Sequence, residues 1–588
     1  MTLTPQDFVA KWKRVTTRER QACQEHFLDL CHLVGHQTPN DYDPNGTRFA
    51  FEMGASKTSG GQGWADVAKL GYFGWEYKGK DHDLDKAYDQ LLRYRDSLQN
   101  PPVLVVSDIN QIIIRTNFTN LPTRVVKLGL DDLLLPESLK ILRAVFFNPD
   151  ELKPRVTVAG VTEEAARQFA RLAGILRKYG EEPQQVAHFL IRLLFCLFAE
   201  DIGLLPERLF PRLLDQTRHN AKDFAGVLRQ LFRAMQTGGY FGADKIRHFN
   251  GGLFDDDLVL ELDGDAMDTI AAIDALDWGS IEPSIFGTLF ERGLDPSKRS
   301  QLGAHYTSRD DILLIVEPVL MAPLRREWQV LKEEVTRLKA EAADEGERKR
   351  AAAVQKISAR LQAFADKIAA TRVLDPACGS GNFLYVALRL LLDLQDEVID
   401  TSDELGAGRF FITVSPSQLY GIEINEYAHE LAQVTIWIGY IQWLVNNGYG
   451  LPADPILKRM DNIHHMDAIL AFDAQGKPVD PEWPEAEVIV GNPPFLGGKK
   501  MRTQLGDKYM DDLFLVYSDS VPHEADLVCY WFERARELIA IGEVKRAGLL
   551  ATNSIRGGAN RKILERIKSS GEIFWAQSDR DWVLDGAA

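Results

Sequence analysis

Two short motifs, each directly after an apolar run, constrain the fold of this chain more than any other feature. Asp375-Pro-Ala-Cys-Gly-Ser-Gly-Asn-Phe383 follows Arg372–Leu374, and Gly491-Asn-Pro-Pro-Phe495 follows Glu487–Val490. Such apolar runs are typical of buried strands, and turn glycines let the backbone approach a ligand without an intervening Cβ. Strand–helix alternation continues from Leu302 onward, so the motifs predict a parallel sheet with a ligand site where its strands end.

Two further segments place acidic residues after predicted strands. Gln418–Ile422 is followed by Glu423, which is positioned to accept hydrogen bonds from ribose hydroxyls. Asn462–Met466 is followed by Asp467, which can meet an adenine ring. A helix N-terminus after the glycine-rich turn completes a site that we expect to bind S-adenosylmethionine. The residues expected to contact this cofactor are Asp375, Ala377, Gly379, Gly381, Phe383, Glu423 and Asp467.

The segment Asn492-Pro-Pro-Phe495 is suited to transfer of a methyl group onto an amino group of a nucleobase. The exocyclic amine of adenine is a poor nucleophile because its lone pair is delocalised into the ring. The amide oxygen of Asn492 and the backbone carbonyl of Pro493 can each accept a hydrogen bond from one N–H of this amine, which frees the lone pair for attack. Phe495 can stack on a base that has left the duplex, and Pro493 and Pro494 fix the carbonyl direction.

The same type of segment can also serve the N4 amine of cytosine, and Phe495 favours adenine. Cys378 is the rival candidate, as a nucleophile for chemistry at cytosine C5. It lies in the glycine-rich turn rather than beside the predicted base pocket, so we interpret it as a small packing residue.

At these motifs the chain resembles the gamma-type amino-methyltransferases of DNA. The resemblance implies a Rossmann-like, S-adenosylmethionine-dependent domain at residues 301–588, with a charged helical arm at 322–370. In that family a segment upstream of the glycine-rich turn holds the amino-acid end of the cofactor. Leu302-Gly-Ala-His-Tyr-Thr-Ser308 matches it here, which makes Thr307 the implied contact.

A second constellation has the spacing Asp66-x9-Glu76-x-Lys78. Glu76 and Lys78 lie two residues apart on a predicted strand and therefore face one side, and Asp66 lies on the preceding strand-like run. Two carboxylates suit Mg²⁺, and a lysine can orient an attacking water. Gln90 and Tyr94 lie one helical turn apart on the next predicted helix. The alternative interpretation is an exposed hairpin with chance charges.

The second constellation resembles the PD-(D/E)xK nucleases that carry a Q-x-x-x-Y helix. This resemblance implies an endonuclease domain at residues 1–155, with Asp66 and Glu76 as Mg²⁺ ligands and Lys78 and Gln90 as further catalytic residues. Residues 156–300 are mainly helical and carry no chemical motif, so we expect a connector there.

The three regions together resemble the MmeI-like type IIL restriction-modification enzymes, and the fold class expected is α/β multidomain. The resemblance implies double-stranded DNA as the partner, methylation of adenine N6 and Mg²⁺-dependent cleavage. In that family a target recognition domain follows the methyltransferase, and we expect it to be missing from this chain or supplied by another. The alternatives are a phage-defence methyltransferase with a non-cutting first domain, and an inactive DNA-binding remnant.

Composition bears on these expectations in three ways. The net charge of −17 argues against nucleic acid as a partner, but basic clusters such as Lys499–Arg502 can still line a channel. The five cysteines form no C-x-x-C pair, which fits a reducing cytoplasm rather than a disulfide or zinc framework. No signal peptide or membrane-spanning run is visible, so we expect a cytoplasmic protein without a membrane partner.

Overall fold

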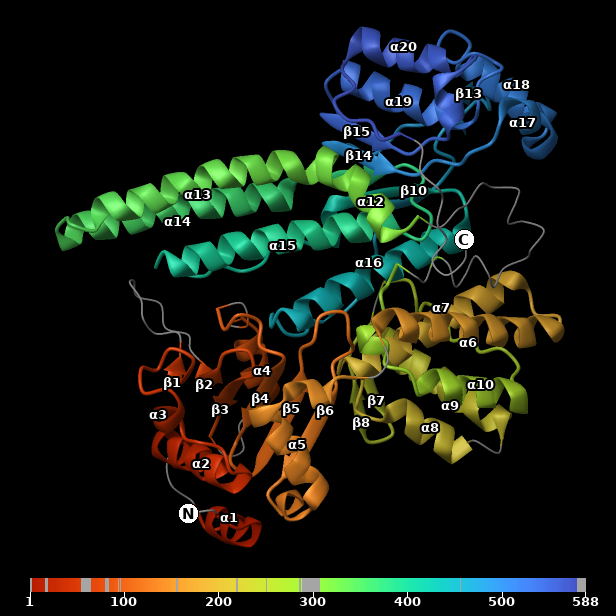
Figure 1. The fold of residues 1–588 in the computed structure, drawn as a ribbon. Helices are drawn as coiled ribbons and strands as arrows, with labels where there is room; N and C mark the ends of the chain where they lie inside the picture. The colour runs from red at the N-terminus through yellow and green to blue at the C-terminus, as the bar shows by residue number, and fades with distance from the viewer. Residues whose placement is uncertain are drawn as a thin grey trace. The chain divides into compact units, whose positions relative to one another are not determined.

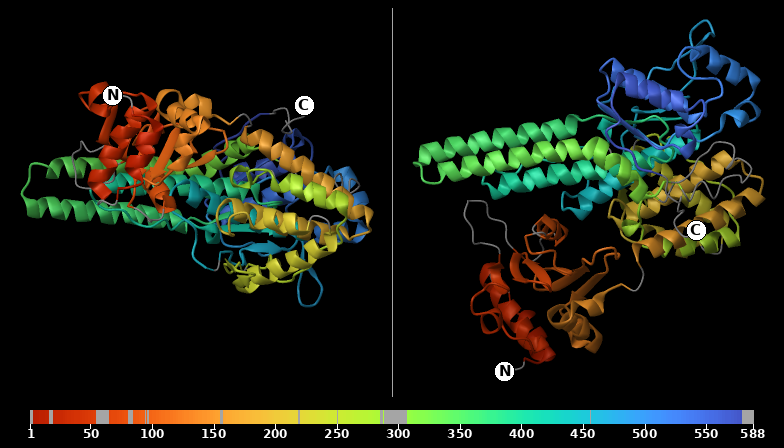
Figure 2. Two further views of the ribbon diagram at one scale, coloured as in Figure 1. Left: turned by 90° about the horizontal axis from the view of Figure 1, so that it is seen from below. Right: turned by 45° about the horizontal axis from the view of Figure 1, so that its top comes forward.

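The computed structural model forms two compact units. The first comprises Met1–Glu163, Asp277–Glu282 and Ile441–Pro452, and the second comprises Glu164–Leu276, Pro283–Tyr440 and Ala453–Ala588. Both are drawn in Figure 1 and Figure 2. The structure describes residues 3–15, 19–53, 65–79, 84–93, 95, 97–154, 157–217, 220–249, 251–284, 287, 307–454 and 456–578.

The first unit is built on a six-stranded sheet whose spatial order follows the sequence. Strands β3 and β4 are parallel, and every other neighbouring pair is antiparallel. The bounds are β1 Phe49–Met53, β2 Ala65–Lys69, β3 Phe73–Tyr77, β4 Val103–Ser107, β5 Gln111–Thr116 and β6 Val125–Gly129. Its helices are α1 Pro5–Trp12, α2 Glu19–Val34, α3 Pro39–Tyr42, α4 Leu84–Arg93 and α5 Pro136–Phe147.

Strand β3 is buried along its whole length, and one of its two faces contributes side chains to a hydrophobic core. Trp75 and Tyr77 belong to an aromatic core that also holds Phe27 of α2 and Phe146 of α5. On the other face the apolar side of α4 packs with Leu104 and Val106 of β4. Because side chains alternate along a strand, Glu76 points to the α4 side and not into the aromatic core.

The second unit begins with a group of helices. Arg192, on α7, is fully buried, and its guanidinium donates to the carbonyl of Leu253 at 2.6 Å and to the Asp256 carboxylate at 2.7 Å. This cation therefore holds the 253–258 loop on the helices. The elements are α6 Val158–Lys178, α7 Pro183–Asp201, α8 Leu209–Thr217, α9 Ala221–Thr237, α10 Gly264–Asp274 and a hairpin of β7 Gly239–Phe241 and β8 Asp244–Ile246.

The second sheet is entirely parallel, in the order β11-β10-β9-β14-β15. Its central strands are fully buried, which explains their short continuous apolar runs. The strands are β9 Val373–Asp375, β10 Leu419–Glu423, β11 Ile463–His465, β14 Val488–Gly491 and β15 Arg546–Leu549. The main helices around them are α12 Arg309–Val316, α15 Asn382–Glu404, α16 Glu426–Asn446, α19 Val528–Ala540 and α20 Arg561–Ser570.

A pair of long helices, α13 (Ala322–Ala342) and α14 (Glu347–Ala370), lies side by side in all views (Figures 1 and 2). Trp328 and Phe364 stack between them, with ring centroids 5.7 Å apart. Smaller elements complete the unit: α17 Gly498–Leu505, α18 Asp507–Val516, and a short hairpin of β12 Ala471–Phe472 and β13 Pro478–Val479. Within the described ranges, no helix combines the length and the apolar character needed to cross a membrane.

Candidate functional site

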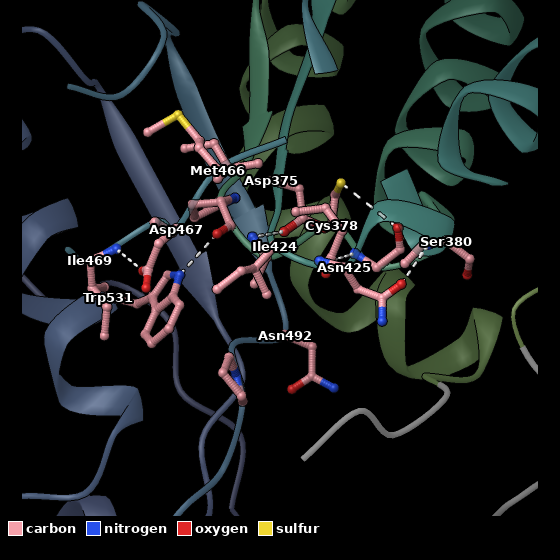
Figure 3. A pocket seen from close by; sticks show the side chains of 18 of the residues that line it. Asp375, Cys378, Ser380, Ile424, Asn425, Met466, Asp467, Ile469, Asn492 and Trp531 are labelled. Carbon is pink, nitrogen blue, oxygen red and sulfur yellow. Dashed lines mark hydrogen bonds between the residues drawn. The ribbon is translucent and has the colours of Figure 1, made fainter. Parts of the chain in front are cut away.

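A cavity of about 270 Å³ lies where the strands of the parallel sheet end (Figure 3). Residues from several segments that lie far apart in the sequence line it, because parallel strands bring their carboxyl ends to one edge of the sheet. Of the residues predicted from the sequence, those that line it are Thr307, Asp375, Ala377, Gly379, Phe383, Glu423, Asp467, Asn492 and Pro494. Gly381, Pro493 and Phe495 lie next to lining residues but are not among them.

The glycine-rich turn after β9 is held open by backbone geometry that only glycine adopts easily. Gly379 and Gly381 have φ values of +53° and +84°. A Cβ on Gly381 would lie 3.1 Å from the Cα of Ala432 on α16. Gly381 therefore allows α15 and α16 to approach each other. Cys378 also lines the cavity, and its Sγ lies close to Gly421 of the neighbouring strand.

Asp375, the last residue of β9, is buried, and one of its oxygens has no hydrogen-bond partner in the part of the chain that the structure describes. Oδ1 accepts a hydrogen bond from the backbone N–H of Ala377 at 3.0 Å, whereas Oδ2 has none among the described residues. Burial raises the pKa of Asp375 to about 8, and the nearby charge of Glu423 adds to the increase. A side chain at Gly491 would meet the Asp375 carboxylate, so this close approach of β14 requires glycine.

Glu423 ends β10, and its carboxylate ties two segments of the cavity wall together. Its Oε2 accepts from the N–H of Gly379 at 2.9 Å, and its Oε1 from the N–H of Asn425 at 2.7 Å. Burial raises the pKa of Glu423. The carboxylate thus anchors the glycine-rich turn, and it retains lone pairs for a ligand.

Asp467 follows β11 and is similarly engaged. Its Oδ1 accepts from the N–H groups of Ile469 and Leu470 at 2.9 and 3.2 Å, and its Oδ2 accepts from the Tyr509 hydroxyl at 2.8 Å. Burial raises the pKa of Asp467. Figure 3 shows the Asp467–Ile469 bond at the side of the cavity, with Trp531 beside it.

Asn492 connects the N-P-P-F segment to the upstream segment. Its Nδ2 donates to Thr307 Oγ1 at 2.9 Å, across a sequence separation of 185 residues. Its Oδ1 is buried and has no hydrogen-bond partner in the described part of the chain. An acceptor without a donor is costly in a protein interior, so this oxygen is available for a ligand N–H. Leu302–Tyr306, the rest of the upstream segment, lies outside the described residues.

Trp531 and Tyr509 are lining residues that the sequence motifs do not predict and that form hydrogen bonds at the site. Trp531 of α19 donates its Nε1–H to the carbonyl of Pro376 at 2.9 Å and so fixes the start of the glycine-rich turn. Tyr509 of α18 donates its hydroxyl hydrogen bond to Asp467. Phe495 packs against the apolar core of this unit. No local spacing in the sequence indicates Trp531 or Tyr509, because both contacts depend on how α18 and α19 fold back onto the sheet.

A second cavity, of about 410 Å³, lies in the first unit and is lined by Asp66, Glu76 and Lys78. Lys78 Nζ lies 2.8 Å from Glu76 Oε1 and 3.0 Å from Gln90 Oε1 on α4. Asp66 Oδ2 accepts from the backbone N–H of Tyr77 at 2.7 Å. The structure thus brings the four predicted residues of this constellation together. Tyr94 lies outside the described residues.

Glu76 has the chemistry expected of a cation ligand. Only 3% of the side chain is exposed, and its Oε2 has no hydrogen-bond partner among the described residues. Burial raises the pKa of Glu76 to about 7, and the charge of Asp66 contributes. Among the described residues no three His, Cys, Asp or Glu side chains converge as a metal-binding group. Two carboxylates nevertheless suit Mg²⁺, which keeps several of its waters.

Comparisons with known proteins give the same family for three parts of the chain. Family models match residues 3–179 (MmeI, N-terminal domain), 184–254 (MmeI, helicase spacer domain) and 348–587 (MmeI, DNA-methyltransferase domain). The solved structure of the type IIL restriction-modification enzyme MmeI in complex with DNA aligns with a TM-score of 0.57 and 27% identity. That alignment covers 69% of this chain and 53% of the MmeI chain.

A curated relative is similar over a comparable span. DNA methyltransferase A of Bacillus subtilis (strain 168) is 27% identical over 442 residues, which covers 71% of this chain and 46% of that protein. The chain therefore spans about half the length of the relatives it matches.

Proposed function

Because the chain belongs to the MmeI-like family of type IIL restriction-modification enzymes, we propose that residues 301–588 bind S-adenosylmethionine and methylate adenine N6 in DNA. The observation that carries this proposal is the buried Oδ1 of Asn492, which has no hydrogen-bond partner among the described residues and lies at the wall of a cavity that Asp375, Glu423 and Asp467 also line. An acceptor for an amine and acids for a nucleoside cofactor are the two requirements of the reaction.

The side chains divide the work of this reaction. Asn492 Oδ1 and the backbone carbonyl of Pro493 each accept a hydrogen bond from one N–H of the target amine. These two hydrogen bonds direct the lone pair of the amine towards the cofactor. Thr307 fixes the orientation of the Asn492 amide through the 2.9 Å bond from Nδ2. S-adenosylmethionine, when bound, would supply the methyl group: its carbon–sulfur bond breaks with the electron pair left on sulfur, and the methylated nitrogen releases one of its two protons. Glu423 and Asp467 hold the ribose and the adenine of the cofactor.

Substitution of Asn492 tests this assignment. Calorimetry with S-adenosylmethionine should show equal binding by the parent chain and by Asn492→Ala, because the amide acts on the substrate amine. Mass spectrometry of nucleosides from DNA treated with the parent should detect N6-methyladenine, and the variant should produce none. Methylation by Asn492→Ala at the parental rate would refute the role of Asn492. N4-methylcytosine as the sole product would assign the activity to the other amine.

For residues 1–155 we propose Mg²⁺-dependent cleavage of double-stranded DNA, centred on Asp66, Glu76 and Lys78. Support comes from Glu76 Oε2, which has no hydrogen-bond partner among the residues that the structure describes and lies in the same cavity as Asp66. These carboxylates would hold the cation, which when bound supplies positive charge to the scissile phosphate. Lys78, held by Glu76 and Gln90, is placed to orient a water. Gln90 thus positions the lysine from α4.

The nuclease proposal predicts that Lys78→Ala abolishes nicking of supercoiled DNA in Mg²⁺ and leaves methylation unchanged. A matched control is Lys86→Ala on α4, which should cut as the parent does. The alternative, a non-cutting first domain, predicts a parent that methylates its target and never cuts it, with or without a recognition domain supplied separately. An inactive remnant predicts neither product under any of these conditions.

A further inference from the structure

The α17–α18 segment forms one wall of the cavity in the parallel sheet, and Tyr509 is its polar contact. Leu505, at the end of α17, and Tyr509, on α18, both line the cavity. The Tyr509 ring packs against the core of this unit, and its hydroxyl donates to Asp467 Oδ2 at 2.8 Å. This segment begins just after the N-P-P-F motif, so one stretch of chain connects the Asn492 region to the Asp467 region.

The hydrogen bonds to Asp467 leave one defined place for a ligand donor. Oδ1 already accepts two backbone N–H groups, from Ile469 and Leu470, which satisfies its two lone pairs. Oδ2 accepts only the Tyr509 hydroxyl in the described part of the chain and retains one lone pair. Tyr509 therefore decides the direction in which the remaining acceptor site of Asp467 points.

We propose that Tyr509 is a positioning residue that makes this cavity selective for a 6-aminopurine nucleoside, by orienting Asp467 Oδ2 towards the 6-amino group. The inference rests on the proposed function, because it takes S-adenosylmethionine as the ligand. Asp467 touches the purine, and Tyr509 acts through Asp467.

The chemistry of the purine edge gives this proposal a specific consequence. An adenine presents an N–H donor at position 6, which the free lone pair of Asp467 Oδ2 accepts. A hypoxanthine presents a carbonyl oxygen there, and two acceptors facing each other in a buried site repel. Sites built to hydrogen-bond one group reject an analogue that lacks it, because a buried polar atom is left unpaired. Loss of the Tyr509 hydroxyl frees the carboxylate to turn and weakens this discrimination.

The test is a comparison of two ligands on the full chain by calorimetry. S-adenosyl-L-homocysteine carries the 6-amino group, and S-inosyl-L-homocysteine carries a 6-oxo group in an otherwise identical molecule. We expect the parent to prefer the adenosyl compound by at least about 30-fold. In Tyr509→Phe this preference should fall about tenfold, the equivalent of one hydrogen bond to a charged group.

Tyr517→Phe is the matched control. The Tyr517 hydroxyl donates to the Asp480 carboxylate at 2.9 Å in the same core, but Tyr517 does not line the cavity. Tyr517→Phe also removes a hydrogen bond from a tyrosine hydroxyl to a carboxylate at comparable burial. The preference for the adenosyl ligand should therefore stay within about twofold of the parental value. If Tyr509→Phe fails to fold, Asp467→Asn serves as the second variant, and its amide should remove the preference by donating to the 6-oxo group.

The outcomes separate this inference from the proposed function. A parallel loss of affinity for both ligands in Tyr509→Phe, with the preference unchanged, overturns the inference and leaves a structural role for Tyr509. A parent that binds the adenosyl ligand without any preference overturns it as well, because Asp467 then does not read the purine. A parent that binds neither ligand refutes the proposed function itself.

Discussion

The buried carboxylic acid of Asp375 should make the ligand-free protein less stable as the pH rises, and Asp375→Asn should remove this effect. The pKa of Asp375 is raised from 3.8 to about 8, so the folded chain keeps a proton that the unfolded chain releases. Between pH 4 and pH 8 the folded state therefore binds one more proton than the unfolded state. Stability consequently decreases with pH across this window.

The magnitude follows from the width of that window. Each pH unit between the unfolded and folded pKa values is worth about 1.36 kcal/mol. At pH 7 Asp375 therefore lowers the free energy of unfolding by about 4 kcal/mol, since roughly three pH units separate neutral pH from the pKa of this group in the unfolded chain. Asparagine keeps the oxygen that accepts the Ala377 N–H and carries no ionisable proton. The variant should therefore be more stable than the parent at pH 7 and equal to it at pH 4.

Hydrogen–deuterium exchange of peptides that cover β9 measures the difference in stability between parent and variant locally. A global unfolding curve is unsuited to this, because the chain has two units that can unfold separately. The opening free energy of β9 should be compared between parent and variant from pH 5 to pH 8, without cofactor and after correction for intrinsic exchange. The expected difference grows with pH and levels off near pH 8. A difference that is constant with pH would show that Asp375 is ionised in the folded protein, and would refute the reasoning.

Three further changes should have measurable effects. The affinity of the first unit for Mg²⁺, measured by calorimetry, should rise up to tenfold per pH unit below about pH 7 and then level off. Burial raises the pKa of Glu76 to about 7, and the cation binds the ionised carboxylate. An affinity that does not change with pH would contradict this. Gly491→Ala should destabilise the second unit by about 1–3 kcal/mol, because its methyl group meets Asp375, and unchanged thermal unfolding would count against the packing. Glu533 is fully buried between Arg536 and Arg566, so Glu533→Ala should lower stability by about 3–5 kcal/mol, and a loss under 1 kcal/mol would show that the pair is hydrated.

The strand ends that carry the cavity could be predicted from the sequence because each depends on local pattern. The apolar runs before Asp375, Glu423 and Asn492 form β9, β10 and β14 as expected. Their side chains meet at one edge because parallel strands share a direction, so fold class and site location follow together. The roles of these residues in binding and catalysis stay predictions.

Other features depend on tertiary packing, and no local pattern encodes them. Strand β1 could not be predicted from the sequence, because Phe49–Met53 is a five-residue run next to glycine-rich turns and becomes a strand only by pairing with β2. Tyr509 and Trp531 lie on helices where nothing distinguishes them from core aromatics. Phe495 is half-buried and packs against the apolar core of this unit, and its stacking on a base stays a prediction.

The alternation along β3 also sets how this chain can change during evolution. Glu76 faces one side of the strand while Trp75 and Tyr77 face the other. An insertion or deletion of a single residue within β3 would turn the carboxylate into the aromatic core and an aromatic ring into the cavity. A single mutation would therefore disrupt both the core and the cavity. Lineages should therefore vary in length in the turns that flank β3, while the strand itself changes only by substitution.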